Sequence, residues 1–505
     1  MRQFRHHPKR IIAVAILAGL TGGCAVGPDY HKPAAPDVDK YTSEQLPEQT
    51  ATADIAGGEA QHFVAGKDIP GDWWTLFHSE PLNALIDQAL KANPDVRAAQ
   101  ASLRVAQENL LAQRGYYYPS VDASAMSSRQ MVADPLASPL NSGQYLFNLH
   151  TAQLDIGYNL DIFGGVRRQV ETMGALVDAQ RFQLEAAYLT LTSNLVAAVV
   201  QEASLRTQLT ATQDIVTSGT EILDLMRSQH QLGAISSADV LGQETLVAQA
   251  QATLPQLQKQ LAQQRNLILA LTGRLPNEEL AENIELDQLQ LPGDLPVTLP
   301  SKLVEQRPDI QLAAAQLHAA TAQVGVATAD MLPKITLGAE IGSVTTDPAK
   351  LFSSGTGFWS IFAGVTQPIF HGGTLLHQKH AAEAGMDVAA AQYQSTVITA
   401  FQNVSDSLRA LQYDAEILNA QLAAKQAAEQ RLEIMRNSIR LGVANSLALL
   451  NAQQAYQQAV ITLAQARANR YADTVALFQA LGGGWWNRND VSGNSTDAGA
   501  ATAKK

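Results

Sequence analysis

The chain has 505 residues with 35 basic and 47 acidic side chains, which give a formal net charge of −12. This acidic balance, which leaves no basic stripe, argues against nucleic acid as a partner. The single cysteine excludes an intrachain disulfide and a four-cysteine zinc site. Hydrophobic residues make up 46% of the chain but aromatic residues only 6%, so we expect long packed helices rather than a large aromatic core.

Residues 1–23 have the pattern of a signal peptide. Four basic residues precede a short apolar run at residues 11–20, which is too short to span a bilayer as a mature helix. Small residues then lead into Cys24, which we expect to carry acyl chains such as palmitate rather than to be a small buried hydrophobe. Ala25 follows, and in bacterial lipoproteins generally this resembles an outer-membrane address. The composition of residues 24–72 predicts a lipidated, extended segment.

The mature body is predicted to be a duplication, because four landmarks recur in the same order at a nearly constant offset. The pairs are Asn93-Pro94-Asp95 and Arg307-Pro308-Asp309, Ile162-Phe163-Gly164-Gly165 and Ile369-Phe370-His371-Gly372-Gly373, Leu232-Gly233 and Leu441-Gly442, and Leu271-Thr272-Gly273 and Leu481-Gly482-Gly483. The first repeat covers residues 73–276 and the second 301–484, with a connector at 277–300. A tail at 485–505 is expected to be disordered.

In each repeat the hydrophobic period changes to two, at about residues 120–162 and about 334–369, which predicts two β-hairpins. Their strands have one apolar face and one polar or small face. A soluble two-layer sheet has the same alternation, but insertion between long helices behind a lipid anchor favours a transmembrane β-barrel. Four strands cannot close a barrel, and unpaired edges are prohibitive in lipid, so several chains must share one barrel.

Residues 166–231 contain no proline and predict one helix, as does their twin at 374–440. At about 1.5 Å per residue, such a helix spans about 100 Å. Helix hairpins are expected at about 166–272 and about 374–481, with apolar residues spaced as in left-handed coiled coils. Polar residues such as Glu202 and Thr212 interrupt the apolar stripe, which favours a hollow helix barrel with one wet side over a solid bundle. Pro255 predicts a bend in the return helix.

Taken together, these motifs resemble one family. The run Cys24-Ala-Val-Gly-Pro-Asp-Tyr-His-Lys-Pro33 after the signal peptide, the two Pro-Asp helix starts and the twin Leu-Gly turns are similar to the outer-membrane factor family. Within it the chain resembles the lipoprotein branch, which is NodT/OprM-like and related to TolC. The resemblance implies an α+β membrane protein: a homotrimer with a 12-stranded β-barrel in the outer membrane, continued by a 12-helix α-barrel through the periplasm.

The same resemblance implies a function and partners. The trimer would be the passive exit duct of a tripartite efflux system, joined by a periplasmic adaptor to an inner-membrane pump. The exported molecules would be drugs, detergents, aromatic acids or other toxic small molecules. The alternative from the residues alone is a structural periplasm-spanning envelope lipoprotein without a channel, which would need no lipid-facing hairpins.

The helix tips are where the resemblance places a periplasmic aperture ringed by charged side chains. The first tip has Gly233 followed by Asp239 in an Asp-Val-Leu context, so three Asp239 carboxylates are the expected ring. The second tip, at Gly442, has Ala448 at the Asp place and Asn451 where a second acid often sits. A helix-capping role is the other interpretation of Asp239, and both roles can hold together.

Catalytic chemistry is not predicted. The sequence has no Gly-x-Ser-x-Gly elbow, P-loop, dinucleotide fingerprint or metalloprotease motif, so we expect no enzyme and no cofactor. His371, His377 and His380 lack a nearby cysteine or carboxylate in register, and we expect surface or pore-lining histidines rather than a metal site.

Overall fold

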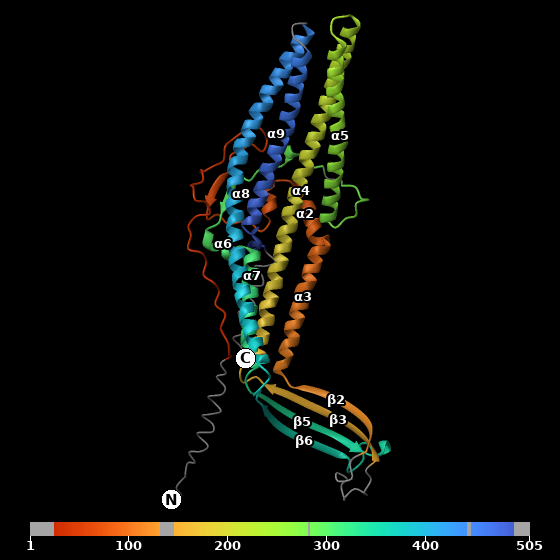
Figure 1. The fold of residues 1–505 in the computed structure, drawn as a ribbon, viewed down its shortest axis with the longest axis vertical. Coiled ribbons are helices and arrows are strands. Elements are labelled where there is room, and N and C mark those ends of the chain that lie inside the picture. The colour runs from red at the N-terminus through yellow and green to blue at the C-terminus, as the bar shows by residue number, and fades with distance from the viewer. Residues whose placement is uncertain (1–24, 132–145, 281–282, 442–445, 489–505) are drawn as a thin grey trace. The chain divides into compact units, whose positions relative to one another are not determined.

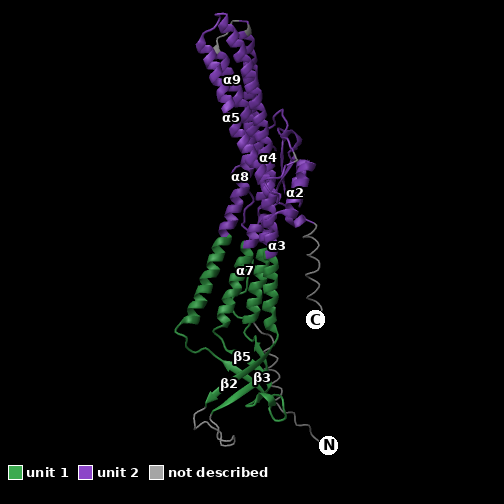
Figure 2. Cartoon of the chain, turned by 90° about the vertical axis from the view of Figure 1, so that its right-hand side faces the viewer, with its two compact units in different colours: residues 1–33, 102–180, 313–393 green, residues 34–101, 181–312, 394–505 purple. Residues whose placement is uncertain are grey.

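The structure, a computed structural model, describes residues 25–131, 146–280, 283–441 and 446–488. The predicted signal peptide, Cys24 and Gly442 lie outside the described residues. The chain divides into two compact units (Figure 2). Unit 1 contains residues 1–33, 102–180 and 313–393, and unit 2 contains residues 34–101, 181–312 and 394–505. The division cuts across both predicted repeats, because the chain passes from one unit to the other within four helices.

The two repeats have the same element order (Figure 1). The first consists of α2 (Glu80–Ala92), α3 (Pro94–Arg114), β2 (Ser120–Met131), β3 (Leu146–Leu160), α4 (Gly165–Gln231) and α5 (Ser237–Leu271). The second consists of α6 (Pro300–Gln306), α7 (Pro308–Ala329), β5 (Lys334–Thr345), β6 (Gly357–Thr366), α8 (Thr374–Arg440) and α9 (Ser446–Ala480). This correspondence agrees with the duplication inferred from the sequence landmarks.

The long helices match their predicted extent. α4 and α8 are each continuous over 67 residues, or about 100 Å at about 1.5 Å per residue. At the start of α4, the N–H groups of Val166 and Arg167 donate to the Asp161 carboxylate at 2.9 and 3.0 Å. α5 continues through Pro255 as one helix. Within the described residues, none of the helices combines the length and the hydropathy needed to cross a bilayer.

Buried polar residues correct one expectation. Glu202 and Thr212 were expected beside water in a hollow barrel, but both are buried within unit 2. The Glu202 carboxylate pairs with the guanidinium groups of Arg206 and Arg265, and the Thr212 hydroxyl donates to the Gln208 carbonyl at 2.7 Å. Partners within the helices therefore replace water at these positions.

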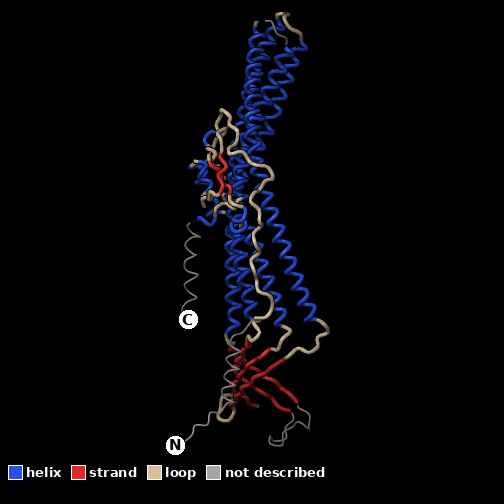
Figure 3. The backbone as a smooth tube through the Cα atoms, turned by 90° about the vertical axis from the view of Figure 1, so that its left-hand side faces the viewer, coloured by secondary structure: helices blue, strands red, loops and turns tan. Residues whose placement is uncertain are grey.

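Four strands, among those drawn in red in Figure 3, form the sheet of unit 1. Their antiparallel order is β2-β3-β5-β6. A second, two-stranded sheet lies in unit 2, where β1 (His62–Ala65) pairs in parallel with β4 (Asp294–Val297). This strand pair joins the predicted N-terminal segment to the predicted connector, so each of these segments contains a β-strand. Beside it, Trp73 stacks on Phe478 with ring centroids 5.2 Å apart, and both side chains are buried.

The expectation of disorder after residue 484 is wrong for its first residues. Trp485–Asn487 form a 3₁₀ turn, and the Trp485 indole N–H donates to the Gln306 carbonyl at 2.6 Å. Arg488 pairs with Glu185 at 2.9 Å. These polar partners and the aromatic surface of the turn hold it against unit 2. Residues 489–505 lie outside the described part of the chain.

Candidate functional site

The sheet of unit 1 presents one continuous apolar face. Directly paired residues of neighbouring antiparallel strands lie on the same face, so the register defines rows across the sheet. Two of these rows are Val121–Ile156–Ala339–Ile361 and Ala123–Leu154–Ile341–Trp359, and a third is Leu160–Ile335–Val365. Large side chains on this face are open, with Trp359 72%, Ile361 77% and Val365 69% exposed. An uncovered apolar face of this kind marks a surface that a membrane or another protein chain covers.

The opposite face is polar. One row across it carries Asp122, Asp155, Glu340 and Ser360. Ser124 donates to the Asp155 carboxylate at 3.0 Å, and Ser360 donates to that of Glu340 at 3.3 Å. An apolar outer face with a polar inner face is the arrangement of a transmembrane β-barrel strand. Phe362 is an exception on the polar face, where its ring lies over Gly338.

The outer strands of this sheet are open. Among the described residues, β2 pairs only with β3, and β6 pairs only with β5. Each outer strand therefore has one row of backbone N–H and C=O groups without a strand partner in this chain. In hydrocarbon every such group needs a partner, so the sheet is complete only when further strands continue it.

The first helix tip has the geometry predicted for its glycine. Gly233 has a φ of 76°, and its N–H donates to the His230 carbonyl at 2.9 Å. The next residue, Ala234, donates to the Gln229 carbonyl at 2.9 Å. This is the Schellman pattern, which ends a helix at a left-handed residue. A side chain at Gly233 would meet no neighbouring atom, so the glycine is required by its backbone angle and not by close packing.

Asp239 belongs to a capping box at the start of α5. Its N–H donates to the Ser236 hydroxyl oxygen at 3.2 Å, and its carboxylate accepts from the Ser236 N–H at 3.1 Å. The Ser236 hydroxyl also donates to this carboxylate at 2.6 Å. The carboxylate is therefore fixed by the cap and remains partly exposed. The structure thus shows Asp239 as a capping residue at the start of α5.

The two tips approach one another in unit 2. A side chain on Gly242 would lie 3.2 Å from the Leu450 side chain, so the beginnings of α5 and α9 are in contact. Asn451 is exposed, whereas Leu449 is buried in a cluster with Leu432, Ile439 and Ala452. The structure therefore brings the Asp239 and Asn451 segments to one end of unit 2.

The sequence did not predict one buried side-chain amide near this tip. Gln243 is fully buried, and its side chain donates to the Gly219 carbonyl of α4 at 2.9 Å. A Cβ atom at Gly219 would lie 3.2 Å from Val247, so glycine permits the close approach of α4 and α5. A polar residue in a helix is normally expected to face water, and no local signal marked this one as buried.

The described chain begins beside the end of β3. The Val26 N–H donates to the Phe163 carbonyl at 3.1 Å. Arg168 donates to the Val26 carbonyl at 3.1 Å and pairs with Asp29 at 2.7 Å. Burial alone would lower the pKa of Arg168, but Asp29 and Glu171 outweigh it and raise the pKa above its usual value. The residues just after Cys24 are therefore held at the start of α4.

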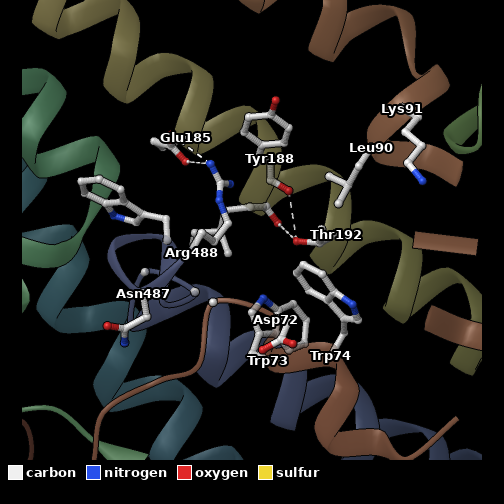
Figure 4. Close-up of a pocket in the computed structure, with 15 residues that line it drawn as sticks. Asp72, Trp73, Trp74, Leu90, Lys91, Glu185, Tyr188, Thr192, Asn487 and Arg488 are labelled. Atoms are coloured by element: carbon white, nitrogen blue, oxygen red, sulfur yellow. Dashed lines mark hydrogen bonds and ion pairs between the residues drawn. The ribbon is translucent and has the colours of Figure 1, made fainter. Parts of the chain in front are cut away.

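Unit 2 contains a cavity of about 500 Å³ that sequence reasoning did not find (Figure 4). Its walls include Trp73, Trp74 and Trp485, together with Tyr188 of α4. Arg488 reaches across one side, pairs with the buried Glu185 and lies 4.6 Å from the centre of the Tyr188 ring. Glu185 is therefore paired within the cavity wall, which also contains Asp72 and Lys91. Within the described residues, no group of three His, Cys, Asp or Glu side chains could hold a metal ion.

Strands with an apolar outer face, joined to helices of 67 residues, define an outer-membrane channel of the helix-and-strand type. Two segments, residues 85–274 and 299–483, match the family model described as "Outer membrane efflux protein". The chain belongs to this family, and the two matches correspond to the two repeats. It is therefore an outer-membrane efflux channel and not a spacer without a channel.

Relatives match over nearly their whole length. The chain is 31% identical over 481 residues to "Probable efflux pump outer membrane protein TtgC" of Pseudomonas putida, covering 95% of this chain and 96% of the relative. It is 28% identical over 475 residues to "Outer membrane protein OprJ" of Pseudomonas aeruginosa, covering 93% and 95%. Among solved structures, the outer-membrane channel OprN has a TM-score of 0.81 at 27% identity, covering 92% of this chain and 100% of that one. VceC of Vibrio cholerae has a TM-score of 0.76 at 26% identity, covering 83% and 100%.

Proposed function

We propose that three copies of this chain close a 12-stranded barrel in the outer membrane and continue it as a 12-helix barrel through the periplasm. The observation that carries the proposal is the four-stranded sheet with one exposed apolar face and two open edges. Lipid can cover the face, but only strands of other copies can satisfy the edges. Three copies bring twelve strands, which exceeds the roughly eight of the smallest bacterial barrels. The assembly is a passive duct without catalytic activity.

Electrical recording in planar bilayers tests this function. Purified protein should form a water-filled pore with a defined single-channel conductance. Its native mass in detergent should correspond to three copies. Folded trimers that show no conductance in any condition would contradict the proposed duct. A stable folded monomer would contradict the proposal that several chains share one barrel.

The proposed anchor is a lipidated Cys24. Val26 and Asp29, which come shortly after Cys24, contact Phe163 and Arg168 between the end of β3 and the first turns of α4. Acyl chains on Cys24 would therefore enter lipid at the end of the sheet. Mass spectrometry of the mature N-terminal peptide should find the acylated residue. An unmodified Cys24, or a retained signal peptide in membrane fractions, would contradict the anchor.

The duct would receive its cargo from an inner-membrane pump through a periplasmic adaptor. Relatives are named as antibiotic, toluene and solvent efflux pump proteins, and one as a pyoverdine export protein. Toxic small organic molecules are therefore the proposed cargo class, with multidrug resistance as the consequence. Crosslinking in whole cells should capture an adaptor on the α4–α5 and α8–α9 hairpins. Deletion of the gene should sensitise cells to such compounds, and an unchanged sensitivity profile would contradict the proposed cargo class.

The aperture is proposed at the helix tips, where Asp239 supplies the charge. Gly233 ends the helix at the first tip with its positive φ, and we assign Gly442 the same role at the second tip. Asn451, in the first turns of α9, supplies a neutral polar side chain to the second tip. This assignment is supported by the partial exposure of Asp239 and by the contact between the beginnings of α5 and α9. Three carboxylates around an aperture would favour cations over anions.

A further inference from the structure

The cavity of unit 2 is built from three separate parts of the chain. Its lining residues come from 71–74 and 90–91, from 185–192 of α4, and from 482–488. All of these segments belong to unit 2, so the cavity does not depend on how the two units are placed. Its volume of about 500 Å³ lies within the range of about 300–1,000 Å³ that is usual for small-molecule sites.

Four aromatic side chains line this cavity. Trp73 and Trp74 lie on one side of it, and Tyr188 lies on the other side together with Arg488 (Figure 4). The fourth ring is that of Trp485. Aromatic rings pack well against another flat ring, either offset or edge to face. The lining therefore favours a planar aromatic molecule.

Two indole N–H groups in the wall have no hydrogen-bond partner among the described residues. They belong to Trp73 and Trp74, which are only 1% and 9% exposed. The neighbouring tryptophans differ, because the Trp485 N–H donates to a backbone carbonyl at 2.6 Å and the Trp486 N–H donates to Asp68 at 3.1 Å. A buried indole N–H normally has an acceptor, so the two donors in the wall indicate an acceptor that the described protein does not supply.

Gly483 leaves space in front of one of these donors. A Cβ atom at this position would lie 3.6 Å from the indole nitrogen of Trp73 and would collide with the side chain of Leu189. All three residues line the cavity. Because glycine has no side chain, the Trp73 N–H stays accessible from the cavity, and an acceptor atom can approach it there.

The charged side chains of the wall favour neither an anion nor a cation. Arg488 pairs with Glu185 at 2.9 Å, while Lys91 and Asp72 are both exposed. The two bases and the two acids cancel in formal charge, and exposed charges contribute little to binding because water screens them. A neutral oxygen acceptor is therefore a better match to the unpaired indole donors than a charged group.

We propose that this cavity binds a neutral planar aromatic molecule that carries a carbonyl oxygen, such as an aromatic lactone or amide. The ring lies between the indoles and Tyr188, and its oxygen accepts from the N–H of Trp73 or Trp74. The bound molecule connects α2, α4 and the turn after α9 within one chain. The proposal does not depend on pore formation, because every residue that it uses belongs to one unit of one chain.

Equilibrium dialysis with two bicyclic probes tests the site. Coumarin carries a lactone carbonyl and no N–H, whereas indole has nearly the same size and flat shape but offers an N–H and no carbonyl. Full-length protein in detergent should bind coumarin saturably, at about one molecule per chain after subtraction of a protein-free detergent blank. Coumarin should bind at least about threefold more tightly than indole, because only coumarin can accept from the indole donors.

Three variants locate the site. The double change Trp73→Phe and Trp74→Phe keeps two aromatic rings but removes both donors, so the preference for coumarin should disappear. Trp486→Phe is the matched control, since Trp486 is not among the residues that line the cavity, and it should keep the preference. Leu90→Trp fills the cavity from α2 without changing either donor, and it should abolish binding of both probes. Thermal unfolding of each variant shows whether it has folded.

The outcomes separate this site from the duct. Folded protein that binds no coumarin saturably, or that binds indole equally well, overturns the proposal, because the cavity then holds only water or an unspecific apolar guest. Binding that survives Leu90→Trp places the ligand elsewhere and overturns it too, even if the double variant does not fold. Single-channel conductance is recorded on the same preparations. Protein that binds coumarin but forms no pore contradicts the duct alone, and protein that forms a pore without binding coumarin contradicts the site alone.

Discussion

Asp239 has a structural role in the helix cap, and the proposed aperture would give the same carboxylate an electrostatic role. The Ser236 N–H and hydroxyl both donate to it, which fixes its position at the first turn of α5. The positive end of a helix dipole also favours a negative charge there. A carboxylate that is held by a cap has little freedom to swing away, so a ring of three would have a defined geometry. The two roles can be separated experimentally, because asparagine keeps a capping oxygen but loses the charge.

We predict that Asp239→Asn weakens block of the channel by Mg²⁺, with a half-blocking concentration raised about threefold or more. Thermal stability should change little because the amide oxygen still accepts from Ser236. Ser236→Ala is the matched control: it should cost about 1 kcal/mol per cap but leave the charge and the block in place. Single-channel recording and thermal unfolding measure both. If the two variants change the block equally, the cap and not the charge is responsible.

A second residue with unusual electrostatics is Asp414 of α8, which lies beside Asp473 of α9. Burial, and then this neighbouring acid, raise the pKa of Asp414 to about 8, although Arg470 acts in the opposite direction. In the unfolded chain the Asp414 carboxyl loses its proton near its ordinary pKa of 3.8, whereas in the folded chain it keeps the proton up to about pH 8. The free energy of unfolding should therefore fall as pH rises through that window.

We predict that Asp414→Asn stabilises the protein at pH 8 by about 1 kcal/mol or more and has little effect near pH 4. The amide mimics the protonated acid, so it removes the cost of keeping a proton in the folded state. The measurement is Tm in detergent from pH 4 to pH 8. Asp406→Asn, on an exposed face of the same helix, should leave the pH profile unchanged. A profile that is equally steep in both variants would exclude the pair as its origin.

At the scale of elements, the turn after α9 shows how a glycine-rich sequence can be ordered. Gly482, Gly483 and Gly484 have φ values of 96°, 68° and 70°, which few other residues tolerate in succession. A side chain at Gly483 would collide with Leu189 of α4. The tight turn places the Trp485 indole N–H within hydrogen-bond distance of the Gln306 carbonyl. It also allows Arg488 to form an ion pair with Glu185, whose side chain is only 5% exposed.

We predict that Arg488→Ala lowers stability by about 3 kcal/mol, because it removes the cation paired with a buried carboxylate. Arg488→Lys should recover part of the loss, since an ammonium keeps the charge but not the planar contact with Tyr188. Lys91→Ala, in the wall of the same cavity, is the control and should be nearly silent. Thermal unfolding in detergent is the measurement. A loss no larger than that of Lys91→Ala would show that the turn is held by its tryptophans alone.

The elements that could be predicted are those with a long local period. α4, α8 and the four strands of the large sheet repeat their pattern over ten or more residues, and they appear where the pattern indicated. β1 and β4 have four residues each and are paired between distant parts of the chain, so no local period marks them. The same holds at the tips: Gly233 follows from helix-ending chemistry, but the buried Gln243 depends on how α4 and α5 pack.

At the scale of the whole molecule, the duplication explains how one chain supplies both a sheet with an apolar face and two long helix hairpins. Each repeat supplies one β-hairpin and one long helix hairpin in the same order. The paired rows then align the apolar residues of both hairpins on one face, although the hairpins are far apart in sequence. The membrane contact is therefore a property of the complete sheet and not of either repeat alone.

The two faces of that sheet lead to a prediction that uses neighbouring residues of β6. Ile361 lies on the apolar face and is 77% exposed, whereas Ser360 lies on the polar face and donates to Glu340. Ile361→Lys should cost about 2–4 kcal/mol per copy if the residue lies near the middle of the bilayer, and the cost is incurred three times in a trimer. Ser360→Lys places the same charge beside a carboxylate in a watery lumen and should be tolerated. Heat-resistant trimer in outer-membrane fractions should thus be lost with Ile361→Lys and retained with Ser360→Lys, and equal losses would contradict the assignment of the faces.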